Sequence, residues 1–115
     1  MFTRNDRIRE VLKTELSLAL RLVKDPGLLG FLTVTDLKLS IDRKTANVYY
    51  SILGSETDKK STARALERIA PFIRQLMRKR LTLKSIPQFI FAYDETPQKA
   101  SRVDKLLDQL RQEKP

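Results

Sequence analysis

The chain contains no cysteine and no histidine among its 115 residues. Without cysteine it forms neither disulfides nor thiolate metal sites, which is compatible with an intracellular protein. Without histidine it lacks the side chain best suited to proton transfer at neutral pH, and zinc sites built on His or Cys are impossible. The adjacent carboxylates Asp94 and Glu95 would point to opposite faces of a strand, so we interpret them as a solvated turn. We therefore expect no catalytic residues and no metal site.

Long apolar runs are also missing, so nothing in the sequence predicts a membrane span, and the first residues do not resemble a signal peptide. The composition is 41% hydrophobic and 32% charged, which is typical of a globular protein. We expect a single domain over residues 1–115, with the last few residues frayed.

Positive charge is concentrated in one quarter of the chain. The formal net charge is +9, and residues 61–90 carry seven Lys and Arg against the single acid Glu67. These seven cations are Arg64, Arg68, Arg74, Arg78, Lys79, Arg80 and Lys84. A positive field that is not cancelled locally attracts polyanions, of which a nucleic-acid backbone is the commonest.

The N-terminal part predicts one helix. Apolar residues recur every three or four positions from Ile8 to Val23, which is the spacing of one helix face. Thr3 or Asn5 can cap the start of this helix. Residues 25–27, Asp-Pro-Gly, end it, because proline disfavours helix in the residue before it and glycine permits a turn.

Two strands are predicted next. Residues 31–41 are rich in β-branched and aromatic side chains, and their apolar positions change parity near Thr35 and Asp36. This change predicts either a β-bulge or a strand buried on both faces. After a turn at residues 42–45, residues 46–52 alternate between apolar and polar, as in a half-buried strand.

Helical spacing returns over residues 57–83 and is interrupted at Pro71. Proline inside a helix removes a hydrogen bond and clashes with the preceding turn, but it is tolerated at a first helical position. We therefore predict two helices, with an interhelical kink at Ile69, Ala70 and Pro71.

The last part predicts a third strand and a final helix. The strand begins at Pro87 and alternates through Tyr93, and the helix starts near Thr96-Pro97 or Ser101. The predicted fold class is α+β, in the order helix-strand-strand-helix-kink-helix-strand plus a C-terminal helix, with the helices packed on one three-stranded sheet.

On an ideal helix most of the clustered cations lie opposite the apolar face. The expected core positions are Leu66, Ile69, Ala70, Ile73, Leu76 and Met77. An outer helix face is commonly charged without a further role, but such faces usually mix both signs. We therefore interpret the seven cations as nucleic-acid-binding residues; the family resemblance described next makes that nucleic acid RNA. Phe72 lies at the edge of this face and either stacks on a base or, as we favour, packs in the core.

The order of elements and several short motifs resemble the bacterial ribosome-binding factor A family, a type II KH-like domain. The matching pieces are Arg4-x-x-Arg7-Ile8, Lys24-Asp25-Pro26, Val34-Thr35, Ser40-x-Asp42, Ala46-x-Val48-Tyr49, Phe72-Ile73-Arg74, Ile86-Pro87, Phe91-x-Tyr93-Asp94 and Arg102-Val103-x-x-Leu106-Leu107. They follow one another at element boundaries over about 110 residues. The chain departs from the family at its kink, where Pro71 stands in place of the glycine of an Ala-x-Gly motif.

The resemblance implies a cytoplasmic factor that binds the immature 30S ribosomal subunit and contacts 16S rRNA. It implies a role in subunit maturation and rRNA processing, with the greatest importance in the cold. It also implies no cofactor and no catalytic activity. We expect a monomer without membrane association. The alternatives are a protein-interaction module or a general single-stranded RNA binder that uses the same basic face.

Overall fold

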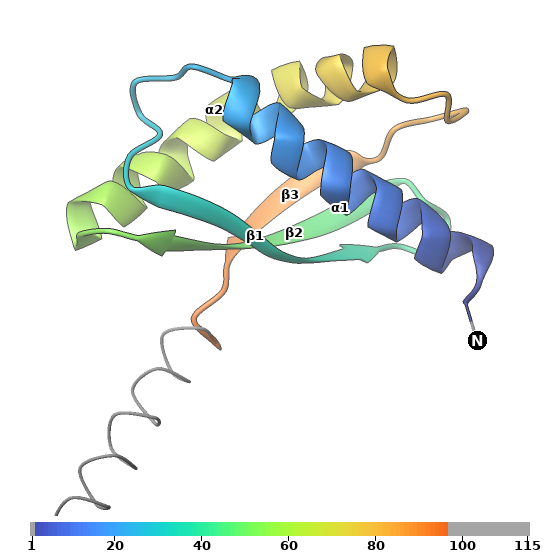
Figure 1. Ribbon diagram of the computed structural model, residues 1–115, viewed down its shortest axis with the longest axis horizontal. Helices are drawn as coiled ribbons and strands as arrows, with labels where there is room; N and C mark the ends of the chain where they lie inside the picture. Colours follow the sequence, from blue (N-terminus) through green and yellow to red (C-terminus); the bar gives the residue numbers. More distant parts are fainter. Residues whose placement is uncertain (1, 97–115) are drawn as a thin grey trace, which may run out of the picture.

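The computed structural model describes residues 2–96, which form two helices packed on a three-stranded sheet (Figure 1). The elements are α1 (Arg4–Leu22), β1 (Phe31–Leu39), β2 (Thr45–Leu53), α2 (Glu56–Arg80) and β3 (Gln88–Tyr93). The strand order is β1-β2-β3, with β2 antiparallel to β1 and parallel to β3. Both helices lie on one face of the sheet (Figure 1), which confirms the predicted α+β class. The expected C-terminal helix lies outside the described residues.

Both helices begin at reciprocal caps. The Thr3 hydroxyl accepts a hydrogen bond from the N–H of Asp6, and the Asp6 carboxylate accepts one from the N–H of Thr3. Ser55 and Asp58 make the same pair of bonds at the start of α2. Each pair satisfies backbone donors that the first helical turn leaves without partners. Of the two caps considered for α1, the structure uses Thr3.

The parity change in β1 is a β-bulge, one of the two predicted explanations. Val34 pairs with Tyr50 and Asp36 pairs with Tyr49, which leaves Thr35 as the extra residue. A bulge adds one residue to one strand, so the apolar positions on either side of it can face the same core. Leu37, after the bulge, is fully buried.

The predicted division into two helices at Ile69, Ala70 and Pro71 is wrong, because α2 continues through Pro71. Proline removes the bond that its N–H would donate to the carbonyl of Glu67. Pro71 and Glu67 are both exposed, so water can solvate that carbonyl. Buried side chains before and after the proline hold both halves against the same core, and this packing outweighs the local cost. They are Leu66, Ile69, Ile73 and Met77.

The core lies between the helices and the sheet. From α1 it contains Leu12, Leu16, Ala19 and Leu20, and from β2 it contains Ala46, Val48, Tyr50 and Ile52. The alternation predicted for residues 46–52 is therefore confirmed. Phe89 of β3 and Ile86 before it complete the side of the core beneath α2.

Candidate nucleic-acid interface

α2 presents its apolar stripe to the core and its cations to the outside. Leu66, Ile69, Ile73 and Met77 are buried, whereas Ala70 and Leu76 are half-buried. All seven predicted cations are exposed except Arg74, which is half-buried. The predicted opposition between the two faces of this helix is confirmed, and it places the charged side chains where a polyanion can reach them.

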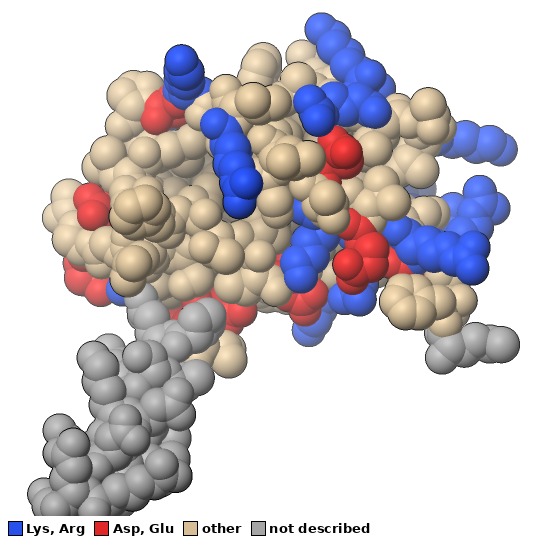
Figure 2. Space-filling view, in the orientation of Figure 1, with Lys and Arg blue, Asp and Glu red and all other residues tan. Residues whose placement is uncertain are grey.

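Figure 2 shows most of the visible Lys and Arg side chains toward one end of the molecule, over the start of α1 and the end of α2. Acidic side chains lie toward the other end, along the lower edge and also among the basic ones in this view. Positive side chains are therefore most numerous at this end, where nearby acidic side chains cancel part of their field.

Three of the seven predicted cations are held by other protein groups. Arg68 forms an ion pair with Asp25 at 2.8 Å, and Arg80 forms one with Glu15 at 2.9 Å. The Arg68–Asp25 bond raises the pKa of the guanidinium and lowers that of the carboxyl. Arg74 donates from Nε to the carbonyl of Ile86 at 3.0 Å. Arg68 and Arg80 are thus partly neutralised, and Arg74 braces the loop before β3.

The other four predicted cations make no hydrogen bond or ion pair within residues 2–96. They are Arg64, Arg78, Lys79 and Lys84. Their side chains are exposed, so their charge is available to phosphates without breaking a contact in the protein.

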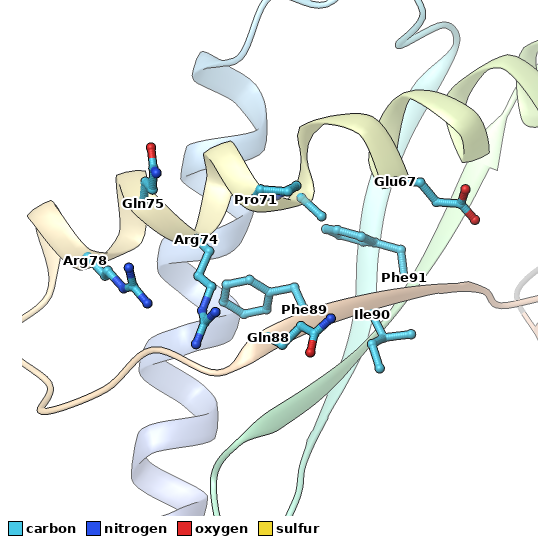
Figure 3. Close-up of a pocket in the computed structure, with 10 residues that line it drawn as sticks. Glu67, Pro71, Arg74, Gln75, Arg78, Gln88, Phe89, Ile90 and Phe91 are labelled. Carbon is cyan, nitrogen blue, oxygen red and sulfur yellow. The ribbon is translucent and has the colours of Figure 1, made fainter.

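A groove between α2 and β3 joins part of this cationic surface (Figure 3). Its volume is about 450 Å³. It is lined by Glu67, Ala70, Pro71, Arg74, Gln75 and Arg78 of α2 and by Gln88, Phe89, Ile90 and Phe91 of β3. Arg74 and Arg78 lie toward one end and Glu67 toward the other. Guanidinium and amide groups above an apolar wall can hold the phosphate and base of a nucleotide.

The sequence did not predict this groove, because its walls come from segments that only the fold brings together. No motif marks Gln75 or Gln88 as a lining residue. The predicted kink residues separate in the structure: Ala70 and Pro71 line the groove, whereas Ile69 is buried in the core. Pro71 therefore shapes the groove wall without dividing the helix.

The expected burial of Phe72 is wrong, since 56% of this residue is exposed. Phe72 follows Pro71 on the outer side of α2. Of the two roles considered for Phe72, its exposure is compatible with base stacking. Phe89 is buried in the core. Phe91 and Tyr93 are half-buried against the core, and each ring makes an edge contact with Tyr50.

No helix among residues 2–96 combines the length and hydrophobicity needed to cross a bilayer. The order of the elements and the mixed sheet, with the basic outer face of α2, define an α+β domain of the type II KH-like class.

The chain belongs to the ribosome-binding factor A family, whose model matches residues 4–107. It is 38% identical to ribosome-binding factor A of Geobacter metallireducens over 114 residues, covering 98% of this chain and 96% of that protein. It is 39% identical to that of Brevibacillus brevis over 112 residues, covering 96% and 92%. The family resemblance read from the motifs is confirmed.

Solved structures agree with this assignment. The crystal structure of ribosome-binding factor A from Thermus thermophilus superimposes with a TM-score of 0.67 at 25% identity, covering 76% of this chain and 91% of that one. A homology model of the Thermus thermophilus factor, fitted into a cryo-EM map of a 30S complex, gives a TM-score of 0.66 at 25% identity, with coverage of 77% and 93%.

Proposed function

We propose that this protein binds the immature 30S ribosomal subunit in the cytoplasm and acts there in maturation of the subunit and processing of 16S rRNA. The observation that carries the proposal is the match to the ribosome-binding factor A family over residues 4–107. The fold adds support, because a related factor of the same fold has been fitted into a map of its complex with the 30S subunit.

The protein's part in this process is binding without catalysis or a cofactor. Arg64, Arg78, Lys79 and Lys84 contact phosphates of 16S rRNA, which fixes the position and orientation of the protein but reads little sequence. The groove between α2 and β3 receives a segment of the same RNA. Specificity then comes from the folded shape of the rRNA and from neighbouring ribosomal proteins.

Sedimentation tests the proposal directly. The purified protein, bound as a monomer, should migrate with immature 30S particles on a sucrose gradient and should be absent from 70S ribosomes. Migration at the top of the gradient at low salt would contradict it and favour a protein-interaction module. Equal affinity for the 30S particle and for unstructured single-stranded RNA would instead identify a general RNA binder.

A further inference from the structure

A small cavity outside the α2 cluster is lined by cations from three segments of the chain. Arg4 of α1, Arg43 of the β1–β2 turn, and Lys84 and Ser85 of the α2–β3 loop line a cavity of about 70 Å³. The rest of its lining is apolar and consists of Ile8, Leu12, Leu39, Leu83 and Pro87. We call it the basic cavity. It lies in the part of the molecule where Figure 2 shows most of the visible positive side chains.

The three segments around the basic cavity are tied to one another. The N–H of Gln88, the first residue after the α2–β3 loop, donates to the carbonyl of Lys44 at 2.9 Å, which joins the start of β3 to the β1–β2 turn. The Nε–H of Arg43 donates to Asn5 at 2.7 Å, which joins the turn to the start of α1. The fold thus holds the cations beside one another. Binding of an anion therefore costs less for ordering these side chains.

Neither neighbouring carboxylate lines the cavity. Asp6 accepts from the backbone N–H of Thr3, and Asp42 accepts from the hydroxyl of Ser40 and the N–H of Lys44. Arg4 and Lys84 make no hydrogen bond or ion pair with any residue in the range 2–96. An anion entering the cavity therefore meets cations that no acid in this range neutralises.

The β1–β2 turn does not carry the residues that would make it most stable. Arg43 has φ of 61°, a left-handed conformation that glycine or asparagine adopts at lower cost. Ile41 at its tip is 95% exposed. Residues that violate local preferences concentrate at functional sites, where the surrounding structure holds them. The left-handed backbone of Arg43 and the exposure of Ile41 mark this turn as a candidate contact surface.

We propose that the basic cavity binds a backbone phosphate of the rRNA, as an anchor apart from Arg64, Arg78 and Lys79 on α2, and that this is the phosphate which Lys84 contacts. A volume of about 70 Å³ admits a phosphate group and excludes a whole nucleotide. The guanidiniums of Arg4 and Arg43, the Lys84 ammonium and the Ser85 hydroxyl are the donors. This inference rests on the proposed function, because it names a further contact with the same RNA.

Salt-dependent binding to purified 30S subunits tests the proposal. The variant Arg4→Gln/Lys84→Gln should bind about tenfold more weakly at 0.1 M salt, and its log–log salt slope should be shallower by about 2, because two phosphate contacts are lost. The matched control is Arg21→Gln/Lys24→Gln. It removes the same charge near the other end of α1, about 26 Å away along the helix, and should keep the wild-type slope.

Arg43→Gly gives an independent readout. Glycine relieves the left-handed backbone, so its melting temperature should stay the same or rise while its affinity falls and its slope becomes shallower by about 1. A variant that melts lower and keeps the wild-type slope would show that Arg43 is only structural. If Arg4→Gln/Lys84→Gln matched the control while wild type bound 30S, the basic cavity and the phosphate contact of Lys84 would be refuted, and 30S binding itself would stand. No binding by wild type would overturn the proposed function as well.

Discussion

At the scale of single residues, the extra residue of the β1 bulge holds the end of β3. Thr35 donates from its hydroxyl to Asp94 Oδ2 at 2.7 Å, and the N–H of Thr96 donates to Oδ1 at 2.9 Å. The hydrogen bond from Thr35 has the larger effect and that from Thr96 adds to it. Together they hold the pKa of Asp94 below its ordinary value of 3.8. The carboxylate interpreted from sequence as part of a solvated turn therefore links β1 to the residues after β3.

Thr35→Val removes the donor with little change of shape. The pKa of Asp94 should rise toward its ordinary value, which the carboxyl carbon shift in an NMR titration will show. The folded-state pKa of Asp94 is depressed, so its hydrogen bonds stabilise the folded protein at pH values above the unfolded pKa of 3.8. This stabilisation is lost as the pH falls through the folded-state pKa of Asp94. The variant should therefore be less stable than wild type at neutral pH, and the difference should shrink below pH 3.8.

Thr33→Val is the control for this experiment, since Thr33 is an exposed threonine of the same strand. It should leave the titration of Asp94 unchanged. An Asp94 pKa that stays the same in Thr35→Val would mean that this hydrogen bond has no energetic role.

At the scale of elements, α2 shows how tertiary packing overrides a local helix breaker. Its buried side chains continue in phase from Leu66 to Met77 across Pro71. A proline in a helix interior costs about 3 kcal/mol relative to alanine. The apolar face that this helix buries exceeds that cost, because each large aliphatic side chain contributes about 1.5–3 kcal/mol.

Pro71→Ala should therefore stabilise the protein by about 1–3 kcal/mol, because it restores an N–H donor to the carbonyl of Glu67. Pro71→Gly should gain about 1 kcal/mol less than alanine, because glycine loses more backbone freedom. Urea unfolding of both variants measures the difference. Destabilisation by Pro71→Ala would indicate that proline fixes a bend that the core requires.

The cationic face of α2 can be separated from its core face by substitution. Arg64→Gln/Arg78→Gln/Lys79→Gln removes only side chains without a partner in the described residues. It should reduce 30S binding at least tenfold. Its stability should fall by no more than about 1 kcal/mol, since the loss is mainly that of favourable charges at the helix C-terminus.

Leu66→Ala is the opposite case on the same helix. It removes a fully buried side chain and should cost about 2–5 kcal/mol of stability, while the folded fraction keeps its affinity. Thermal melts and 30S binding, measured on both variants, test whether binding depends on the outer face of α2 and stability on its core face. Normal binding by the charge variant would remove the outer face of α2 as a functional surface.

At the scale of the whole molecule, association with the ribosome should be governed by salt. Four cations of the predicted set are free of partners within residues 2–96, and each phosphate contact contributes about −0.9 to the slope of log K against log salt. We expect a slope of roughly −3 to −5 for wild type on 30S subunits, measured from about 50 to 300 mM salt. A slope near zero would leave phosphate contacts without support.

Much of the fold was open to prediction from sequence because it depends on local patterns. The spacing of apolar residues placed α1, the three strands and the buried face of α2, and the parity change in β1 marked its bulge. The Thr3 cap, the turn after Lys24 and the motifs that identify the family are also short-range. Each of these signals lies within one element or at its boundary, where chain geometry alone limits the choices.

The tertiary structure decided what no single segment contains. It carried α2 through Pro71, because the core on both sides of the proline outweighs one lost hydrogen bond. It paired Arg68 with Asp25 and Arg80 with Glu15, so two of the seven predicted cations are partly neutralised. It also placed Arg4 and Arg43 beside Lys84. Charge can be counted along a chain, but the positions of neutralising partners depend on contacts between segments that are distant in sequence.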